Sequence, residues 1–224
     1  MNERKGDTND LIISYKTLRR CIGTLGMALP FVLVLGGLLI FGVEFKSSIS
    51  NYYHSEMRDV FVGIMCVTGV FLLSYKGYLL KDNVAANIAG FCAIGVALFP
   101  VSAEGSSTGQ VIEIFHYIFA ISFFLTLAYV SIALFTKTKE GAVPDERKNR
   151  RNSVYRICGW TMVVSIALVG VYYIIPGDMQ DALRGFRPVF VLEAIAVIAF
   201  GVSWLTKGAA IPVFNDTEPA SVVA

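Results

Sequence analysis

The chain has 224 residues, of which 55% are hydrophobic and only 16% are charged. Soluble domains carry about a quarter charged residues, so this composition excludes an ordinary soluble protein. The near balance of 19 Lys and Arg against 17 Asp and Glu argues against a nucleic-acid partner, and two histidines with four cysteines give no zinc-finger or disulfide framework. The apolar residues come in long blocks instead, which is typical of a membrane protein.

Six apolar stretches predict six transmembrane helices, because a helix needs about 20 apolar residues to cross about 30 Å of hydrocarbon. In chain order they cover residues 21–43, 60–75, 84–103, 114–136, 157–177 and 188–206. The second helix is expected to run from 59 to 80, with Lys76 and Lys81 snorkelling at its end. The first is expected to remain as an uncleaved anchor, because its apolar stretch is longer than that of a signal peptide. We therefore predict an all-α polytopic bundle.

Lysine and arginine predict the orientation of this bundle. The two ends of the chain, the turn near 81–83 and the loop 136–153, together with the helix ends that adjoin them, hold 15 of these residues, and the opposite side holds 4. Both termini are therefore expected in the cytoplasm. The resulting organisation is a cytoplasmic N-terminus (1–20), a six-helix transmembrane domain (21–206) and a disordered cytoplasmic tail (207–224) in the cell membrane.

The unusual polar residues share one depth, near the outer surface. Asp59 begins the second predicted helix, Glu113 and His116 begin the fourth, and Glu193 lies roughly 7–8 Å into the sixth. Ionisable groups are costly in lipid, so each needs a partner and a reason. We predict one outward-facing polar site with eight residues: Tyr53, His54, Arg58, Asp59, Glu113, His116, Arg187 and Glu193.

Three interpretations of this site remain open. It could be a pocket for a lipid headgroup or small ligand, in which Arg58, Arg187 and the pair Tyr52–Tyr53 hold an anionic group. It could be a hydrogen-bonded network that fixes helix packing, with the tyrosine pair belonging to the interfacial aromatic belt. It could also hold a metal, since Glu113-x-x-His116 has the spacing of half a di-iron site, but no second copy of that motif exists. No metal or other cofactor is expected.

Glu193 is expected to have a partner on another helix. Arg187 is close in sequence, but six residues at 100° each turn the two side chains in different directions. We predict that Glu193 accepts a hydrogen bond from His116, Arg58 or a tyrosine of the first outer loop. The second, fourth and sixth predicted helices would then converge at their outer ends.

Three segments carry a resemblance to known membrane proteins: 48–54 (SISNYYH), 83–90 (NVAANIAG) and 115–124 (FHYIFAISFF). They resemble a group of six-helix bacterial membrane proteins that is similar to the Frag/DRAM/Sfk-type family of eukaryotes. The resemblance implies a role in lipid handling or membrane homeostasis. A second comparison is with ceramidase-like membrane hydrolases, whose zinc ligands are matched in type by Ser50, His54, Asp59 and His116, whereas Glu193 stands in the last helix, where that family has paired histidines.

We therefore expect an integral membrane protein whose outward-facing pocket binds a lipid headgroup or small ligand. The alternative is a membrane-embedded, metal-dependent lipid hydrolase that uses the same residues. Membrane lipids are the expected partners, nucleic acid is not expected, and self-association is left open.

Overall fold

The computed structural model describes residues 14–77, 79–103, 110–138 and 145–211. Within these residues the chain is helical and has no strand, which confirms the all-α prediction. The long helices are α1 (Tyr15–Gly36), α2 (Arg58–Ser74), α3 (Leu80–Leu98), α4 (Gln110–Tyr129), α5 (Glu146–Ile174) and α7 (Pro188–Lys207). The shorter elements are α6 (Gly177–Leu183), the π-helical turns η1 (Gly37–Phe41) and η3 (Val130–Leu134), and the 3₁₀ turns η2 (Ser50–His54) and η4 (Arg184–Phe186).

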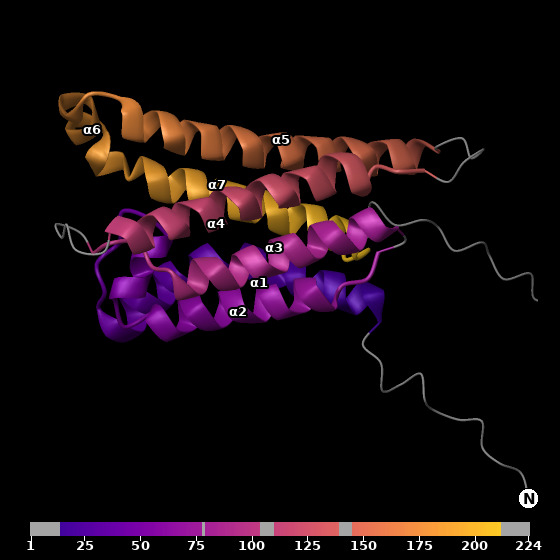
Figure 1. The fold of residues 1–224 in the computed structure, drawn as a ribbon, viewed down its shortest axis with the longest axis horizontal. Coiled ribbons are helices and arrows are strands. Elements are labelled where there is room, and N and C mark those ends of the chain that lie inside the picture. Colours follow the sequence, from indigo (N-terminus) through magenta and orange to yellow (C-terminus); the bar gives the residue numbers. More distant parts are fainter. Residues whose placement is uncertain (1–13, 78, 104–109, 139–144, 212–224) are drawn as a thin grey trace, which may run out of the picture.

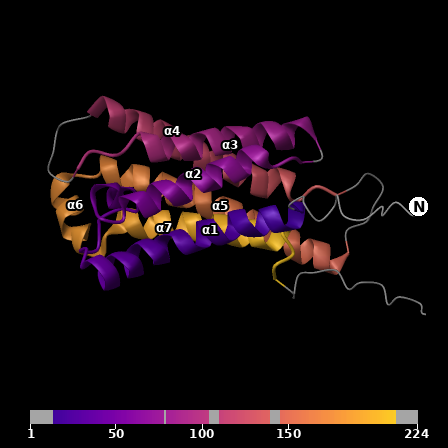
Figure 2. The same cartoon turned by 90° about the horizontal axis from the view of Figure 1, so that it is seen from below.

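The six long helices lie side by side along one axis (Figures 1 and 2). Each packs on the helix before it and the helix after it in the chain, and α7 closes the ring by packing on both α5 and α1. One end of the bundle, the loop end, carries α6 and the connection between α1 and α2. At the opposite end, the terminus end, α1 begins and α7 ends, and Arg20 of α1 donates to the carbonyl of Gly208 at 2.8 Å.

Four helical stretches in the described part of the chain are long and apolar enough to cross a membrane. They are Tyr15–Phe41, Val111–Leu134, Glu146–Ile174 and Pro188–Lys207. Large apolar side chains are also exposed on the outside of the bundle, including Leu39 at 77% and Ile174 at 83%. An apolar exterior of this kind is what a multi-pass membrane protein presents to lipid.

The other two predicted spans differ from the helices observed. Helix α2 ends at Ser74 rather than near residue 80, because Tyr75 has extended backbone. With 17 residues, its length is about 26 Å. Helix α3 starts at Leu80, where the Asp82 side chain accepts from the Leu79 N–H at 3.0 Å. The expected turn near Asp82 is therefore present, and its carboxylate caps the helix.

Two glycine pairs let the backbones of neighbouring helices approach closely. A Cβ atom on Gly69 of α2 would lie 2.8 Å from the carbonyl oxygen of Gly90 on α3. On the other side of the bundle, a Cβ on Gly201 of α7 would lie 2.8 Å from the carbonyl oxygen of Gly23 on α1. Membrane helices associate through such close packing, because lipid provides no hydrophobic driving force between them.

Candidate functional site

The connection between η1 and α2, residues 42–57, is the centre of the polar contacts at the loop end. We call it the α1–α2 loop; it contains the 3₁₀ turn η2. Its Tyr52 is only 1% exposed and packs on Phe190 of α7, with ring centroids 6.4 Å apart. Burial raises the pKa of the Tyr52 phenol. Tyr52 is therefore a core residue and not an exposed member of an aromatic belt.

Helix α7 holds the α1–α2 loop through two hydrogen bonds. The carboxylate of Glu193 accepts from the N–H of Ile49 at 2.6 Å, at the start of η2. The N–H of Phe190 donates to the carbonyl of Ser47 at 3.0 Å. Phe190 is in the first turn of α7, where N–H groups have no partner within the helix. Helix and loop therefore satisfy each other's backbone groups.

Helix α4 holds the next residue of the same loop through His116, which is 2% exposed. One ring nitrogen, Nδ1, lies 2.7 Å from the carbonyl oxygen of Phe99, and the other, Nε2, lies 3.0 Å from Ser50 Oγ. A carbonyl can only accept, so Nδ1 carries the proton, and in the neutral ring Nε2 accepts from the Ser50 hydroxyl. His116 thus ties the end of α3 and the loop to α4.

Two further predicted site residues bind the segment that follows α3. Glu113 accepts from Ser102 Oγ at 2.7 Å and from the Tyr117 hydroxyl at 2.6 Å. His54 Nε2 donates to the carbonyl of Val101 at 2.7 Å. Both contacts hold residues 101–102 against the rest of the loop end.

The remaining residues of the predicted site lie at its surface. Arg58 donates to the Tyr53 hydroxyl at 2.9 Å, and its guanidinium lies 4.6 Å from the centre of the Tyr53 ring. Asp59 is exposed in the first turn of α2. Arg187 has a left-handed backbone conformation, with φ 49°, and covers the ring of Phe45 at 4.8 Å.

The predicted partners of Glu193 are therefore wrong. Glu193 contacts neither His116 nor Arg58 through a hydrogen bond; it accepts from the backbone of Ile49, while His116 binds the neighbouring Ser50. The two ionisable side chains meet through adjacent residues of one loop. A cavity of about 40 Å³ beside them is lined by Ser50, Glu193 and apolar side chains.

The donor set does not fit a metal. Both ring nitrogens of His116 point to protein partners, and Nε2 of His54 does too. Across the described ranges, no three His, Cys, Asp or Glu side chains are close enough together to hold a metal ion. The arrangement fits the predicted packing network, extended from helix–helix contacts to helix–loop contacts.

A separate groove of about 510 Å³ opens on the surface of the loop end. It lies between the α1–α2 loop and the η4 turn, and three cationic residues, Lys46, Arg184 and Arg187, line it. Glu44 is the one carboxylate among the described residues of the lining, and Arg184 also has Asp181 at 3.9 Å. Of these cations only Arg187 was predicted as a site residue.

The distribution of charge along the chain could have identified the other two. Lys46 and Arg184 belong to the four basic residues predicted for the outer side, and three of those four line this groove. Because they are far apart in the sequence, no local pattern indicates that they are close in space.

The chain matches no protein-family model, no curated protein and no solved structure.

Proposed function

We propose that this chain is an integral protein of the cell membrane, with six spanning helices and cytoplasmic termini, that binds a phosphate-bearing lipid headgroup at its outer surface. The observation that carries the proposal is the groove lined by Lys46, Arg184 and Arg187. Three cations and one carboxylate favour an anion, and guanidinium groups bind phosphate oxygens through paired hydrogen bonds.

The surroundings of the groove support a lipid rather than a soluble anion. The short helix α6 and the η4 turn next to it expose three large apolar side chains, Met179 at 51%, Leu183 at 39% and Phe186 at 76%. Asp178, Asp181 and Arg184 stand among them. A short segment with this composition is typical of an element lying in the membrane interface, at the depth of the headgroups.

The six-span arrangement is supported by the ring of helices. Helices α2 and α3 run alongside the four strongly apolar ones and complete the ring between α1 and α4. The predicted orientation places the loop end, and with it the groove, outside. The resemblance to the Frag/DRAM/Sfk-type family points in the same direction, towards lipid handling.

Thermal stability in detergent provides a test, because a ligand that binds only the folded state raises the unfolding temperature. The protein is titrated with dihexanoyl phosphatidic acid, dihexanoyl phosphatidylcholine or inorganic phosphate. The double variant Lys46→Gln, Arg184→Gln removes two groove cations, and Arg58→Gln is the matched control because Arg58 binds Tyr53 away from the groove.

We expect phosphatidic acid to raise the unfolding temperature of the wild type and of Arg58→Gln, and the double variant to lose this shift. An equal shift with inorganic phosphate would assign the groove to a free anion instead of a lipid. An equal loss in Arg58→Gln would show that only overall charge matters, and no shift in the wild type would refute the proposal.

The hydrolase alternative makes a separate prediction about metal content. It requires about one zinc or iron per chain that is lost in His116→Ala. Elemental analysis of the purified protein decides it, and we expect no stoichiometric metal because the His116 nitrogens are already bonded to Phe99 and Ser50.

A further inference from the structure

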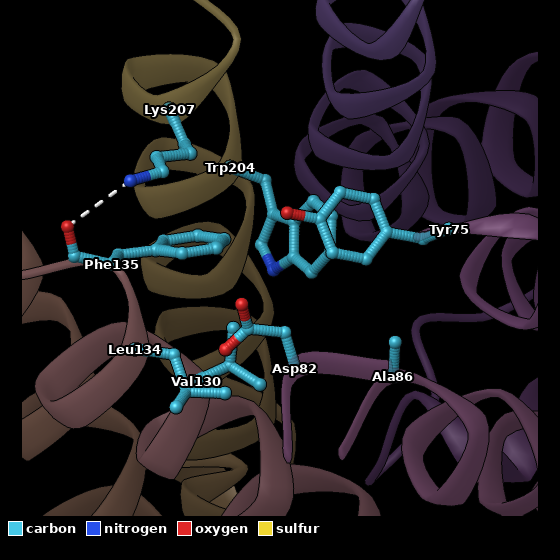
Figure 3. Close-up of a pocket in the computed structure, with 8 residues that line it drawn as sticks. All are labelled: Tyr75, Asp82, Ala86, Val130, Leu134, Phe135, Trp204 and Lys207. Atoms are coloured by element: carbon cyan, nitrogen blue, oxygen red, sulfur yellow. Dashed lines mark hydrogen bonds between the residues drawn. The ribbon is translucent and has the colours of Figure 1, made fainter. Parts of the chain in front are cut away.

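A second polar cavity lies at the terminus end, far from the groove. It is small, about 20 Å³, and is enclosed by residues from α3, η3 and α7 and from the turns that follow α2 and η3 (Figure 3). Its polar lining comes from Tyr75, Asp82, Trp204 and Lys207. Lys207 is turned away toward the carbonyl oxygen of Phe135, 3.1 Å from Nζ.

Trp204 presents an unsatisfied donor to this cavity. Its side chain is 0% exposed, and its Nε1 has no hydrogen-bond partner among the residues that the structure describes. The rings of Tyr75 and Phe135 pack against it, each with centroids 5.2 Å away. In Figure 3 the indole nitrogen faces the side of the cavity where the carboxylate of Asp82 lies. A buried N–H without an acceptor is unfavourable, so this geometry calls for an acceptor in the cavity.

Asp82 defines the other side of the site. One of its carboxylate oxygens accepts from the Leu79 N–H, and the other lies 3.8 Å from Lys137 Nζ. A carboxylate has about four lone-pair sites, so it accepts further hydrogen bonds beyond these contacts. An occupant of the cavity must therefore accept from Trp204 and donate to Asp82.

Size and charge identify the occupant. One water molecule needs roughly 10–15 Å³ of such space, and the cavity of about 20 Å³ holds no larger group. A metal cation cannot accept from an indole N–H, and an anion would face the carboxylate of Asp82. Water both accepts and donates.

We propose that the cavity binds one ordered water molecule that accepts from Trp204 Nε1–H and donates to the carboxylate of Asp82. This water joins the start of α3 to α7. Because Asp82 also attracts Lys137 beyond η3, a single molecule links three segments of the terminus end. The site is independent of the headgroup groove.

Nuclear magnetic resonance of the indole proton tests the proposal in detergent micelles. The chain has two tryptophans, and Trp160 is 59% exposed on the outside of α5. In the variant Trp160→Phe with ¹⁵N-labelled tryptophan, the one remaining indole signal belongs to Trp204, and the cavity is untouched. We expect a cross-peak between this indole proton and a long-lived water.

A variant that fills the cavity with a larger side chain tests whether the water lies there. Ala86 lines the cavity and is 1% exposed, so Ala86→Val places two methyl groups in the space of the water. We expect this variant to lose the water cross-peak and to shift the indole signal toward that of an unbonded N–H. Val84→Leu, at an exposed position of the same helix, is the control and should keep the cross-peak.

Three results would overturn the proposal. The first is a resolved indole signal that shows no cross-peak to water. The second is an indole chemical shift typical of a hydrogen bond without a water cross-peak, because this would mean a direct bond to Asp82. The third is a water cross-peak that survives in Ala86→Val.

Discussion

Glu193 and His116 come from different helices and hold adjacent residues of one loop. Glu193 accepts from Ile49 and His116 bonds to Ser50, so the α1–α2 loop is fixed from α7 and α4 at the same point. At the residue scale, polar groups buried at the loop end thus support a segment of irregular backbone. Irregular backbone next to apolar helices is tolerated where protein groups satisfy its N–H and C=O groups.

Replacing Glu193 with alanine should lower the stability of the folded protein. The substitution leaves the Ile49 N–H without its acceptor, and an unsatisfied group of this kind costs about 1–3 kcal/mol. Equilibrium unfolding in mixed micelles measures the change. Glu193→Gln should be milder because the amide oxygen still accepts, and Glu44→Ala, exposed in the same loop, should change stability by less than about 0.5 kcal/mol. Equal losses in Glu193→Ala and Glu44→Ala would contradict this role.

The double variant Glu193→Ala, His116→Ala should lose less stability than the sum of the two single variants. Once either anchor is removed, the loop around Ile49 and Ser50 loosens, and the second anchor holds a segment that is already displaced. A double-mutant cycle on unfolding free energies measures the coupling. Strictly additive losses would mean that the two side chains act on independent parts of the loop.

At the element scale, small residues decide how closely neighbouring helices approach. The Gly69–Gly90 contact brings α2 and α3 together backbone to backbone, and Gly23–Gly201 does the same for α1 and α7. Small residues recur along these helices, but not every one lies at a contact. Gly63 is in the same helix as Gly69 and has open space around it. Spacing along a helix does not reveal which small residue faces a neighbour.

Gly69→Ala should therefore destabilise the bundle, whereas Gly63→Ala should not. A Cβ on Gly69 would lie 2.8 Å from a backbone oxygen that cannot move aside, and overpacking of this kind costs about 1–3 kcal/mol. Gly63 lies in the same helix with nothing within 4 Å, so alanine there is expected to be neutral or mildly stabilising. Unfolding temperatures of the two variants in detergent test the difference, and equal values would contradict the close contact.

At the scale of the whole molecule, the charge asymmetry and the ring of helices together predict the topology. Four exposed positions divide between the two ends: Glu56 and Asp178 at the loop end, Lys76 and Asn149 at the terminus end. In a background without the native cysteines, cysteine at Glu56 or Asp178 should react with an impermeant maleimide in intact cells. Cysteine at Lys76 or Asn149 should react only after permeabilisation.

The same experiment tests the crossing of α2 and of α5 separately. Glu56 precedes α2 and Lys76 follows it, so reaction of both from the same side would mean that α2 does not cross the membrane. Reaction of Asp178 and Asn149 from the same side would contradict the crossing of α5. Reversed labelling of all four positions would keep α2 and α5 as spans and overturn the orientation.

The sequence by itself determined the helical class and the positions of the helices, because transfer of apolar side chains out of water depends on local composition. The ends of the helices were predicted less accurately. The predicted second helix continues past Ser74, where the structure turns, since hydropathy does not register the extended backbone of Tyr75. The eight polar residues were also predicted to lie at one end of the bundle, and all eight lie at or near the loop end.

Only the tertiary structure decided which of these residues meet. Contacts depend on how each helix is rotated and how deep it lies, and neither is fixed by composition. Lys46 and Arg184 line one groove from distant parts of the chain, as Asp82 and Trp204 line one cavity. Glu193 accepts its hydrogen bond from a backbone N–H. Every residue except proline carries this group, so no sequence pattern can indicate which one is the partner.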